Sequence, residues 1–227
     1  MKLLAFDTSN QALSLAILEN DTILVAVTLN NKKNHSVTLM PSIEFLMATL
    51  ELQPKDLDRI VVAMGPGSYT GLRIAVTTAK TLAQTLKIDL IGISSLLALV
   101  PVGIEGLVIP LIDARRNNVY AGFYKNTQAI RPEEHLPFET VLELVSSEKQ
   151  VTFVGEVAAF EEQIRKTLPN ACIQPTLPNA VAIGRMGLSL PAQSIHDFVP
   201  NYLKRVEAEE NWLKNHKESH ESYLKRL

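Results

Sequence analysis

The sequence predicts a soluble α/β protein, and three observations support this fold class. Apolar runs of strand length alternate along the chain with longer segments whose apolar positions recur at helical spacing. Hydrophobic residues make up 46% of the 227 residues and charged residues 20%, a composition typical of folded globular proteins and not of disordered ones. The length suits either one large domain or two smaller lobes, each able to bury a core.

The first 30 residues predict a three-stranded meander. Residues 2–7 form a short apolar run that ends in the polar corner Asp7-Thr8-Ser9, and a second apolar run covers residues 13–18. Asn20-Asp21 is a turn signal, and residues 22–29 are rich in β-branched and aliphatic side chains. We therefore expect the third strand to return beside the second.

The next segments predict two helices around a strand and a glycine-rich loop. Residues 36–50 carry apolar side chains on more than one helical face, and Pro41 lies near the start of that helix, where it either costs little or causes a kink. Residues 60–64 predict a buried strand, residues 65–71 a tight loop and residues 72–86 a helix. Three small side chains in this helix invite close packing against another helix: Ala75, Ala79 and Ala83.

The second half of the chain predicts further strands at residues 88–93, 107–112, 119–124 and 151–154, and helices at residues 157–168 and 181–190. Pro and Gly near residues 101–106 suggest a boundary between lobes 1–103 and 104–200. After Pro200 the charges become dense and mixed in sign, so residues 201–227 are predicted to be a solvated, helical tail.

Charge and cysteine content limit the function and the compartment. The formal net charge is −2, so any RNA contact must be local or supplied by a partner. The single cysteine, Cys172, excludes an internal disulfide, fits a reducing compartment, and is predicted to be a buried core residue of a strand. Asp7 interrupts the apolar N-terminus too early for a signal peptide, and no run has the roughly 20 apolar residues of a membrane span. We expect a cytoplasmic protein.

The stretch Gly65-Pro66-Gly67-Ser68-Tyr69-Thr70-Gly71-Leu72-Arg73 is the most informative part of the sequence. It joins a strand to a helix, and backbone amides at such a helix start can bind phosphate. It matches neither the P-loop nor the dinucleotide-binding pattern. A tight loop that only sets helix packing explains the glycines equally well.

Asp7-Thr8-Ser9 places a carboxylate and two hydroxyls at a sheet edge, where nucleotide phosphates or magnesium bind in other proteins, although an ordinary polar turn explains the triplet more simply. If both segments act together, they form a weak nucleotide-binding site. Its residues are Asp7, Thr8, Ser9, Gly65, Gly67 and Ser68.

The sequence gives no catalytic residue and no metal site. His35 is followed by Thr38 and Leu39 where a second metal ligand would be needed, so we expect it to cap or pack the helix. His216 and His220 have helical ligand spacing but lack a third ligand. Arg115-Arg116 with Asp113 can bind an anion or form a solvated turn, and no histidine lies in a hydrolase motif.

Taken together, five segments closely resemble the TsaB, or YeaZ, family: Asp7-Thr8-Ser9, His35-Ser36, residues 65–73, Asp113-Ala114-Arg115-Arg116 and Tyr202-Leu203-Lys204-Arg205. The resemblance implies an actin-like ATPase fold (the ASKHA, ribonuclease H-like class) of two lobes, each with a mixed sheet flanked by helices. It also implies a role in making threonylcarbamoyladenosine next to the anticodon of tRNAs that read codons starting with A.

In that system the related subunit TsaD is the transferase and carries a metal-binding helix with two histidines. This chain has Leu39 four residues after His35, so we expect neither metal nor catalysis to carry over. The resemblance implies TsaD and TsaE as partners, a homodimer when the chain is alone, tRNA contact only through the complex, no membrane, and no cofactor beyond weak ATP or ADP at the partner interface. The interface would use the two first-lobe helices, with His35, Leu39, Ile43, Tyr69, Thr70, Leu72, Arg73 and Val76.

Two alternatives stay open at this point. The chain could act alone as an actin-like ATPase or glycoprotease-type hydrolase that uses Asp7 and the glycine loop. Alternatively, the tail, rich in Lys and Arg, could bind tRNA directly, which predicts a steep dependence of binding on salt.

Overall fold

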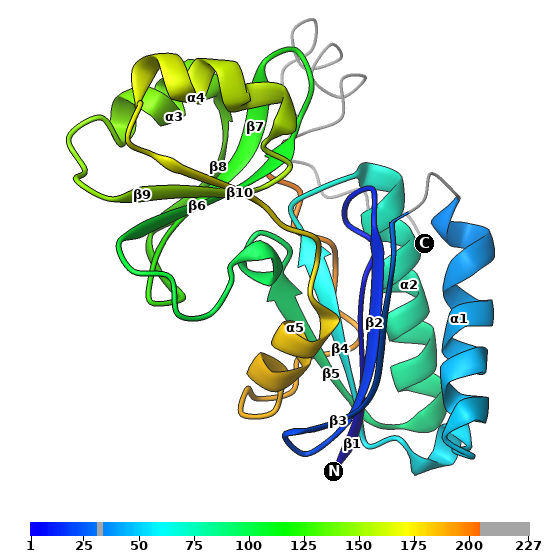
Figure 1. The fold of residues 1–227 in the computed structure, drawn as a ribbon. Coiled ribbons are helices and arrows are strands. Elements are labelled where there is room, and N and C mark those ends of the chain that lie inside the picture. Colours follow the sequence, from blue (N-terminus) through cyan, green and yellow to red (C-terminus); the bar gives the residue numbers. More distant parts are fainter. Residues whose placement is uncertain (31–33, 205–227) are drawn as a thin grey trace, which may run out of the picture.

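The computed structural model of the protein describes residues 1–30 and 34–204 and contains two five-stranded sheets, one in each of two lobes (Figure 1). The first sheet has the order β3-β2-β1-β4-β5, built from β1 (Lys2–Asp7), β2 (Leu13–Glu19), β3 (Thr22–Leu29), β4 (Arg59–Gly65) and β5 (Asp89–Ser94). The second has the order β10-β9-β6-β7-β8, built from β6 (Leu107–Asp113), β7 (Asn118–Lys125), β8 (Gln128–Pro137), β9 (Val151–Gly155) and β10 (Cys172–Pro175).

The two lobes follow the same chain path. In each lobe three antiparallel strands lead through a helix to a fourth strand that pairs in parallel with the first, and a second helix leads to a fifth strand parallel to the fourth. The connecting helices are α1 (His35–Thr49) and α2 (Tyr69–Leu86) in the first lobe, and α3 (Phe138–Leu144) and α4 (Glu161–Thr167) in the second. This likeness lies in the backbone path, because no sequence repeat accompanies it.

Helices cover both faces of the first sheet. On one face α1 and α2 lie side by side, and their buried side chains form a core with Leu4, Phe6 and Leu15. On the opposite face α5 (Ala180–Gly187) packs Ala180 and Ile183 against the other side chains of the same strands. The predictions of the first three strands and of the glycine loop are confirmed. The helix α1 continues through Pro41.

The path of α5 differs from the division expected from chain order. Residues 104–200 were assigned to one lobe, yet after β10 the chain leaves the second sheet and α5 packs on β1, β2 and β4 of the first. The following segment stays there: the Gln193 amide donates to the Leu90 carbonyl at 2.9 Å and the Asn201 amide to the Met64 carbonyl at 2.7 Å. The order of elements in the chain does not show that α5 packs on the first sheet, because its apolar face could pack against either sheet.

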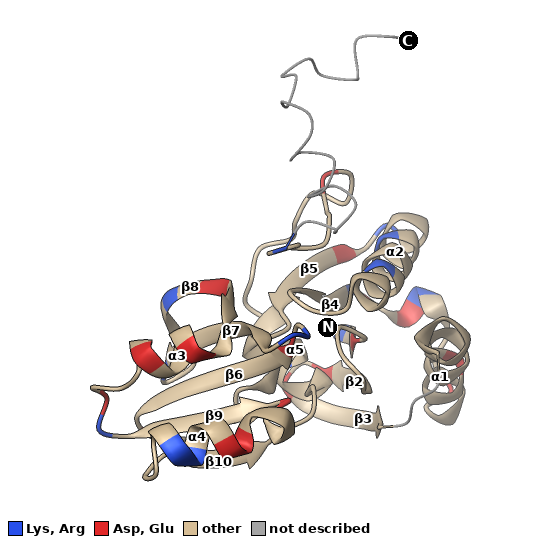
Figure 2. Ribbon diagram, turned by 90° about the horizontal axis from the view of Figure 1, so that it is seen from above, with Lys and Arg blue, Asp and Glu red and all other residues tan. Residues whose placement is uncertain are grey.

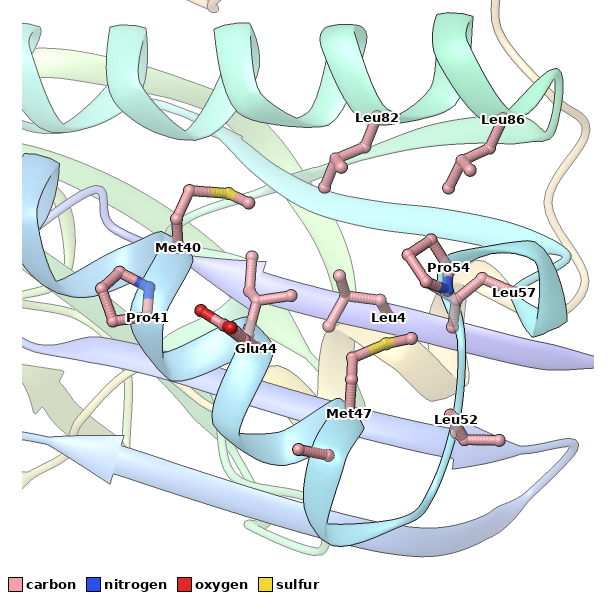
Figure 3. A pocket seen from close by; sticks show the side chains of 12 residues that line it. Leu4, Met40, Pro41, Glu44, Met47, Leu52, Pro54, Leu57, Leu82 and Leu86 are labelled. Atoms are coloured by element: carbon pink, nitrogen blue, oxygen red, sulfur yellow. The ribbon is translucent and has the colours of Figure 1, made fainter.

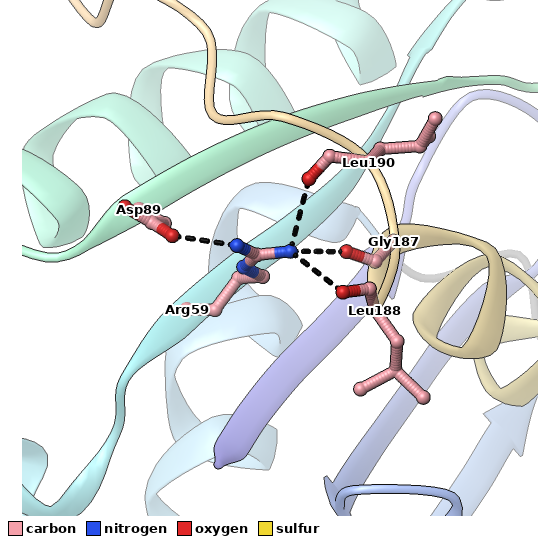
Figure 4. Close-up of polar contacts among 5 residues, drawn as sticks. All are labelled: Arg59, Asp89, Gly187, Leu188 and Leu190. Carbon is pink, nitrogen blue, oxygen red and sulfur yellow. Dashed lines mark hydrogen bonds and ion pairs between the residues drawn. The ribbon is translucent and has the colours of Figure 1, made fainter.

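Arg59 fixes this return of the chain (Figure 4). Arg59 is 9% exposed, and its Nη1 lies 2.6 Å from the Gly187 carbonyl and 3.1 Å from those of Leu188 and Leu190. Its Nη2 donates to Asp89 at 2.6 Å. Carbonyls at a helix end lack partners within the helix, so one guanidinium satisfies the end of α5 and the turn beyond it.

Replacing Arg59 with methionine is expected to destabilise the protein by about 2 kcal/mol, because hydrogen bonds to charged groups are lost while the carbonyls stay partly buried. The midpoint of urea unfolding measures the change. Arg165→Met is the matched control, since among the described residues Arg165 pairs with exposed Glu161 at 2.7 Å, and its replacement should cost less than about 0.5 kcal/mol. Equal effects of the two replacements would contradict this role for Arg59.

Several sequence predictions need correction. β8 and α3 were not predicted, and the helix expected at residues 157–168 is a short 3-10 turn followed by α4. Cys172 is exposed, because β10 is an edge strand that pairs only with β9, so its expected burial is wrong. The predicted helical tail covers residues 201–227, and its residues from 205 onward lie outside the described part of the chain. Among the described helices, none is long and apolar enough to span a membrane.

Candidate functional site

A cleft of about 500 Å³ lies between the lobes and is lined by both. The repeated chain path explains its position, since β1 and β6 occupy the same place in their sheets and both end here. Each strand ends in an aspartate that makes the same turn: Asp7 accepts from the Ser9 amide at 2.7 Å, and Asp113 accepts from the Arg115 amide at 2.7 Å. The two corners therefore face one another across the cleft.

The two aspartates differ sharply in burial. Asp113 is exposed in the cleft, whereas Asp7 is 0% exposed beneath the first corner. Burial raises the pKa of Asp7 to about 6, against the lowering effects of the hydrogen bond from the Ser9 amide and of the nearby His35. The carboxyl of Asp7 is thus an internal group and not a wall of the cleft.

A buried polar cluster surrounds Asp7. Oδ2 of Asp7, Oγ of Ser9 and Nδ1 of His35 are buried and have no hydrogen-bond partner among the described residues. Nε2 of His35 lies 2.8 Å from the Asn10 carbonyl, which ties the first turn of α1 to the β1 corner. His35 therefore packs at the helix start as expected, while Asn34 is the residue that caps α1.

The glycine loop closes directly on this corner. A side chain at Gly71 would lie 2.0 Å from the Thr8 carbonyl oxygen, and one at Gly67 2.3 Å from that of Ser9. The Thr8 hydroxyl donates to the Gly71 carbonyl at 2.7 Å, and the Ser68 amide donates to Ser9 at 2.6 Å. Glycine is needed at both positions because the loop backbone lies so close to the backbone of Thr8 and Ser9 that a side chain would clash with it.

This geometry bears on both explanations of the glycine loop. The six residues predicted for nucleotide binding do come together, but the space beside Gly67 and Gly71 holds the chain's own carbonyls. Ser68 also caps α2 through its side chain, which accepts from the Gly71 amide at 3.3 Å. The Ser68 and Gly71 amides are therefore engaged within the chain, and the close contacts at Gly67 and Gly71 fit a packing role, while Ser68, Tyr69 and Thr70 line the cleft.

Two polar cleft residues of the second lobe, Glu156 and Tyr120, were not predicted from the sequence. Glu156, directly after β9, accepts a hydrogen bond from the Asp113 amide at 2.9 Å, and burial raises its pKa against the lowering effects of the nearby Asp113 and Gln11 amides. Tyr120 of β7 lines the same cleft. No local motif marks these residues, because they reach the cleft only through the fold of the second lobe. Arg115 also lines the cleft, as an anion-binding role would require.

The Tyr202 motif lies against the start of α2. The rings of Tyr69 and Tyr202 stack with centroids 5.0 Å apart, and the guanidinium of Arg73 lies 5.2 Å from the Tyr69 ring centre. Asn201 places its carbonyl where a side chain at Gly65 would be, 2.4 Å from that position. Residues 201–204 and the glycine loop, far apart in sequence, therefore form one surface.

The outer side of α1 is an exposed apolar face, which we define by Val37, Met40 and Phe45. Their exposed fractions are 65%, 47% and 69%. Glu44 is the helix's single charged residue, and Figure 2 draws α1 almost entirely without charge. Soluble proteins rarely leave adjoining large apolar side chains in water unless the surface binds a partner.

This face corrects part of the predicted interface. Leu39, Leu72 and Val76 are at most 3% exposed and belong to the core without lining a described pocket, whereas Ile43, at 5%, lines the groove described next. Because apolar residues surround α1, helical spacing alone could not separate its inner side from its outer one. The other predicted residues remain accessible: half-buried His35, and exposed Tyr69, Thr70 and Arg73.

An apolar groove of about 460 Å³ continues this face between α1 and α2 (Figure 3). Met40 and Met47 of α1 and Leu82 and Leu86 of α2 line it, with Leu4 of β1 also contributing. Methionine side chains adapt their shape to an incoming apolar group. The groove and the outer face of α1 together suit a helix or an apolar side chain from another molecule.

Metal ligands do not gather anywhere in the described part of the chain as groups of three or more His, Cys, Asp or Glu. The two tail histidines, His216 and His220, lie outside that part.

Comparisons with known proteins agree with this architecture. The family model described as "TsaD: tRNA N6-adenosine threonylcarbamoyltransferase" matches residues 22–212. The tRNA threonylcarbamoyladenosine biosynthesis protein TsaB of Bacillus subtilis (strain 168) is 37% identical over 231 residues, which covers 96% of this chain and 100% of that protein.

Solved structures show the same fold. A Pseudomonas aeruginosa protein described as similar to peptidase YEAZ has a TM-score of 0.75 at 25% identity, covering 89% of this chain and 99% of that one. The activator of the 2-hydroxyisocaproyl-CoA dehydratase from Clostridium difficile, solved with bound ADPNP, has a TM-score of 0.51 at 12% identity, covering 83% and 94%, and shows likeness of fold alone. The predicted actin-like fold is confirmed. The chain belongs to the family that the TsaD model describes and, within it, to the TsaB, or YeaZ, proteins.

Proposed function

We propose that this chain is a non-catalytic subunit of the complex that transfers threonylcarbamoyl to the adenosine next to the anticodon in tRNAs reading codons that start with A. In this proposal it binds and supports the transferase TsaD through the exposed apolar face of α1, the groove beside it and the first turn of α2. The same surface pairs two copies when the chain is alone, and the complex recruits TsaE and contacts tRNA.

Membership of the family supports the pathway, because the Bacillus subtilis relative carries threonylcarbamoyladenosine biosynthesis in its name. One structural observation supports the partner role: Val37, Met40 and Phe45 are solvent-exposed beside an apolar groove. Large apolar and aromatic side chains at the centre of an interface supply most of its binding energy. The packing of the glycine loop on its own corner supports a role without phosphate chemistry.

The assay for this proposal compares the purified chain with and without TsaD in threonylcarbamoyl transfer to tRNA. We expect no turnover by the chain alone and turnover when TsaD and the remaining components are present. Robust turnover by the chain alone would refute the proposal.

Phe45→Asp is expected to weaken binding to TsaD at least 30-fold, or by about 2 kcal/mol, because a charge replaces an apolar group at the proposed centre of the interface. Isothermal titration or surface plasmon resonance measures the affinity. Val102→Asp is the matched control: Val102 is 81% exposed, lies outside α1 and α2, and should leave the affinity unchanged. If both variants bind like the unmodified chain, the α1 face is not the TsaD surface.

Titration with ATP separates this proposal from an ATPase acting alone. Weak or negligible binding by the isolated chain fits the packed glycine loop, and any weak ATP or ADP site is proposed to lie at the partner interface. Micromolar affinity that Asp7→Ala abolishes would favour the ATPase instead.

A further inference from the structure

Glu133 connects the two lobes. It lies on β8 in the second lobe, and its Oε1 accepts hydrogen bonds from the hydroxyl of Tyr124 on β7 and from that of Ser94 at the end of β5 in the first lobe. The Ser94 oxygen also accepts from the amides of Leu96 at 3.1 Å and Leu97 at 3.2 Å. One carboxylate oxygen thus joins the second lobe to the start of the crossover between the lobes.

That crossover is an apolar wedge between the two sheets, formed by residues 96–100 around the 3-10 turn Leu97–Leu99. On one side Leu96, Leu99 and Val100 pack with Val108, Ile112, Tyr124 and Val154 of the second lobe. On the other side Leu97 and Ala98 belong to the core formed by the first sheet and α5. Any change in the angle between the lobes must disturb this packing.

Glu156 makes a second carboxylate link at the cleft itself. It accepts from the Asp113 amide in its own lobe at 2.9 Å, and the Gln11 amide at the β1 corner of the first lobe lies close enough to lower its pKa, against the larger raising effect of burial. Gln11 and Glu156 both line the cleft, so this contact closes across its wall. The two glutamates therefore hold different first-lobe segments: the β1 corner and the end of β5.

We propose that Glu133 and Glu156 form an interlobe latch that keeps the cleft at one width, so that the chain moves as a single rigid body. Hydrogen bonds to carboxylates are about twice as strong as those between neutral groups, and lobe rotation would break both sets while opening the apolar wedge. A ligand in the cleft changes the lobe angle only if it supplies more differential binding energy than the latch and wedge together.

The distance between the lobes tests this latch. Cys172, the chain's single cysteine, is exposed on β10 and accepts one fluorescent label, and Thr22→Cys, exposed at the start of β3, accepts the second. Single-molecule energy transfer at picomolar concentration excludes contacts between copies. We expect one narrow distance distribution for the otherwise unmodified chain and a roughly twofold broader one for Glu133→Ala with Glu156→Ala.

Glu134→Ala is the matched control, because Glu134 neighbours Glu133 on β8 but pairs with Arg131 of the same strand. It should leave the distribution narrow, as should Glu133→Gln, which keeps an acceptor oxygen. Amide exchange of Leu96 and Leu97 should quicken about tenfold in Glu133→Ala alone. Should the double variant fail to fold, the single variant decides: a narrow distribution with unchanged exchange overturns the latch.

Discussion

Gly71→Ala is expected to destabilise the protein by about 4 kcal/mol, a large fraction of the roughly 5–15 kcal/mol stability of a typical domain. The added methyl group would stand 2.0 Å from the backbone oxygen of Thr8. This oxygen cannot retreat freely, because the Thr8 hydroxyl holds the Gly71 carbonyl at 2.7 Å and the Ser68 amide holds Ser9 at 2.6 Å. The start of α2 must therefore move away from β1. Chemical unfolding, or the yield of folded protein at 37 °C, measures the loss.

Gly103→Ala provides the matched control for this prediction. Gly103 has φ +86°, and a side chain there meets nothing within 4 Å. In the control variant the alanine must adopt a left-handed backbone conformation but meets no steric clash. We expect it to lower the free energy of unfolding by about 1 kcal/mol. If Gly71→Ala were no worse than Gly103→Ala, the close contact between the glycine loop and the β1 corner would not be essential.

Asp7→Asn is expected to stabilise the protein by about 3 kcal/mol at pH 7.5. The pKa of Asp7 rises from an ordinary 3.8 to about 6 in the folded state, because burial disfavours the charged carboxylate. The folded state then binds a proton more tightly than the unfolded state, so the stability of the natural chain should fall as the pH rises from about 4 to about 6 and stay low above it. Asparagine keeps an oxygen for the Ser9 amide and removes the charge.

The test is unfolding by urea at several pH values. The free energy of unfolding of Asp7→Asn should equal that of the natural chain near pH 4. Its excess over the natural chain should grow up to about pH 6 and stay constant at higher pH. Asp113→Asn is the control, since Asp113 makes the same turn with the Arg115 amide at 2.7 Å but is exposed. If the two chains differed in free energy of unfolding by the same amount at every pH, the buried charge of Asp7 would not be the source of the stabilisation.

Local patterns predicted the first lobe well and the second lobe in part, since β6, β7 and β9 lie where strands were expected while β8 and α3 were missed. The opening strands and the glycine loop have strong signals, because apolar runs end at clear polar corners. β8 was missed because Gln128–Pro137 contains Pro132, Glu133 and Glu134, residues that disfavour strands, and it forms only as an edge strand beside β7. The duplication of the lobes was also missed, since Asp7 and Asp113 share a turn while their neighbours differ.

The candidate site divides in the same way. Asp7-Thr8-Ser9 and Gly65 to Ser68 were expected together, and they meet because β1 and β4 are neighbours in one sheet. Glu156 had no signal, because its partners Asp113 and Gln11 lie 43 and 145 residues away in the chain. The outer face of α1 was predicted only as a helix with apolar residues all round, and three-dimensional packing was needed to show that Phe45 faces water while Ile43 does not.

The return of residues 188–204 to the first lobe has a consequence for synthesis on the ribosome. The second sheet uses strands between residues 107 and 175, so its partners emerge in succession. The first sheet begins with Lys2, yet hydrogen-bond partners of Arg59, Gly92 and Met64 include Leu188, Gln193 and Asn201, which are made much later. The N-terminal lobe is therefore expected to be the last to reach its native state during translation, and a chain stopped before residue 188 should expose that lobe to proteases while its C-terminal neighbour is already resistant.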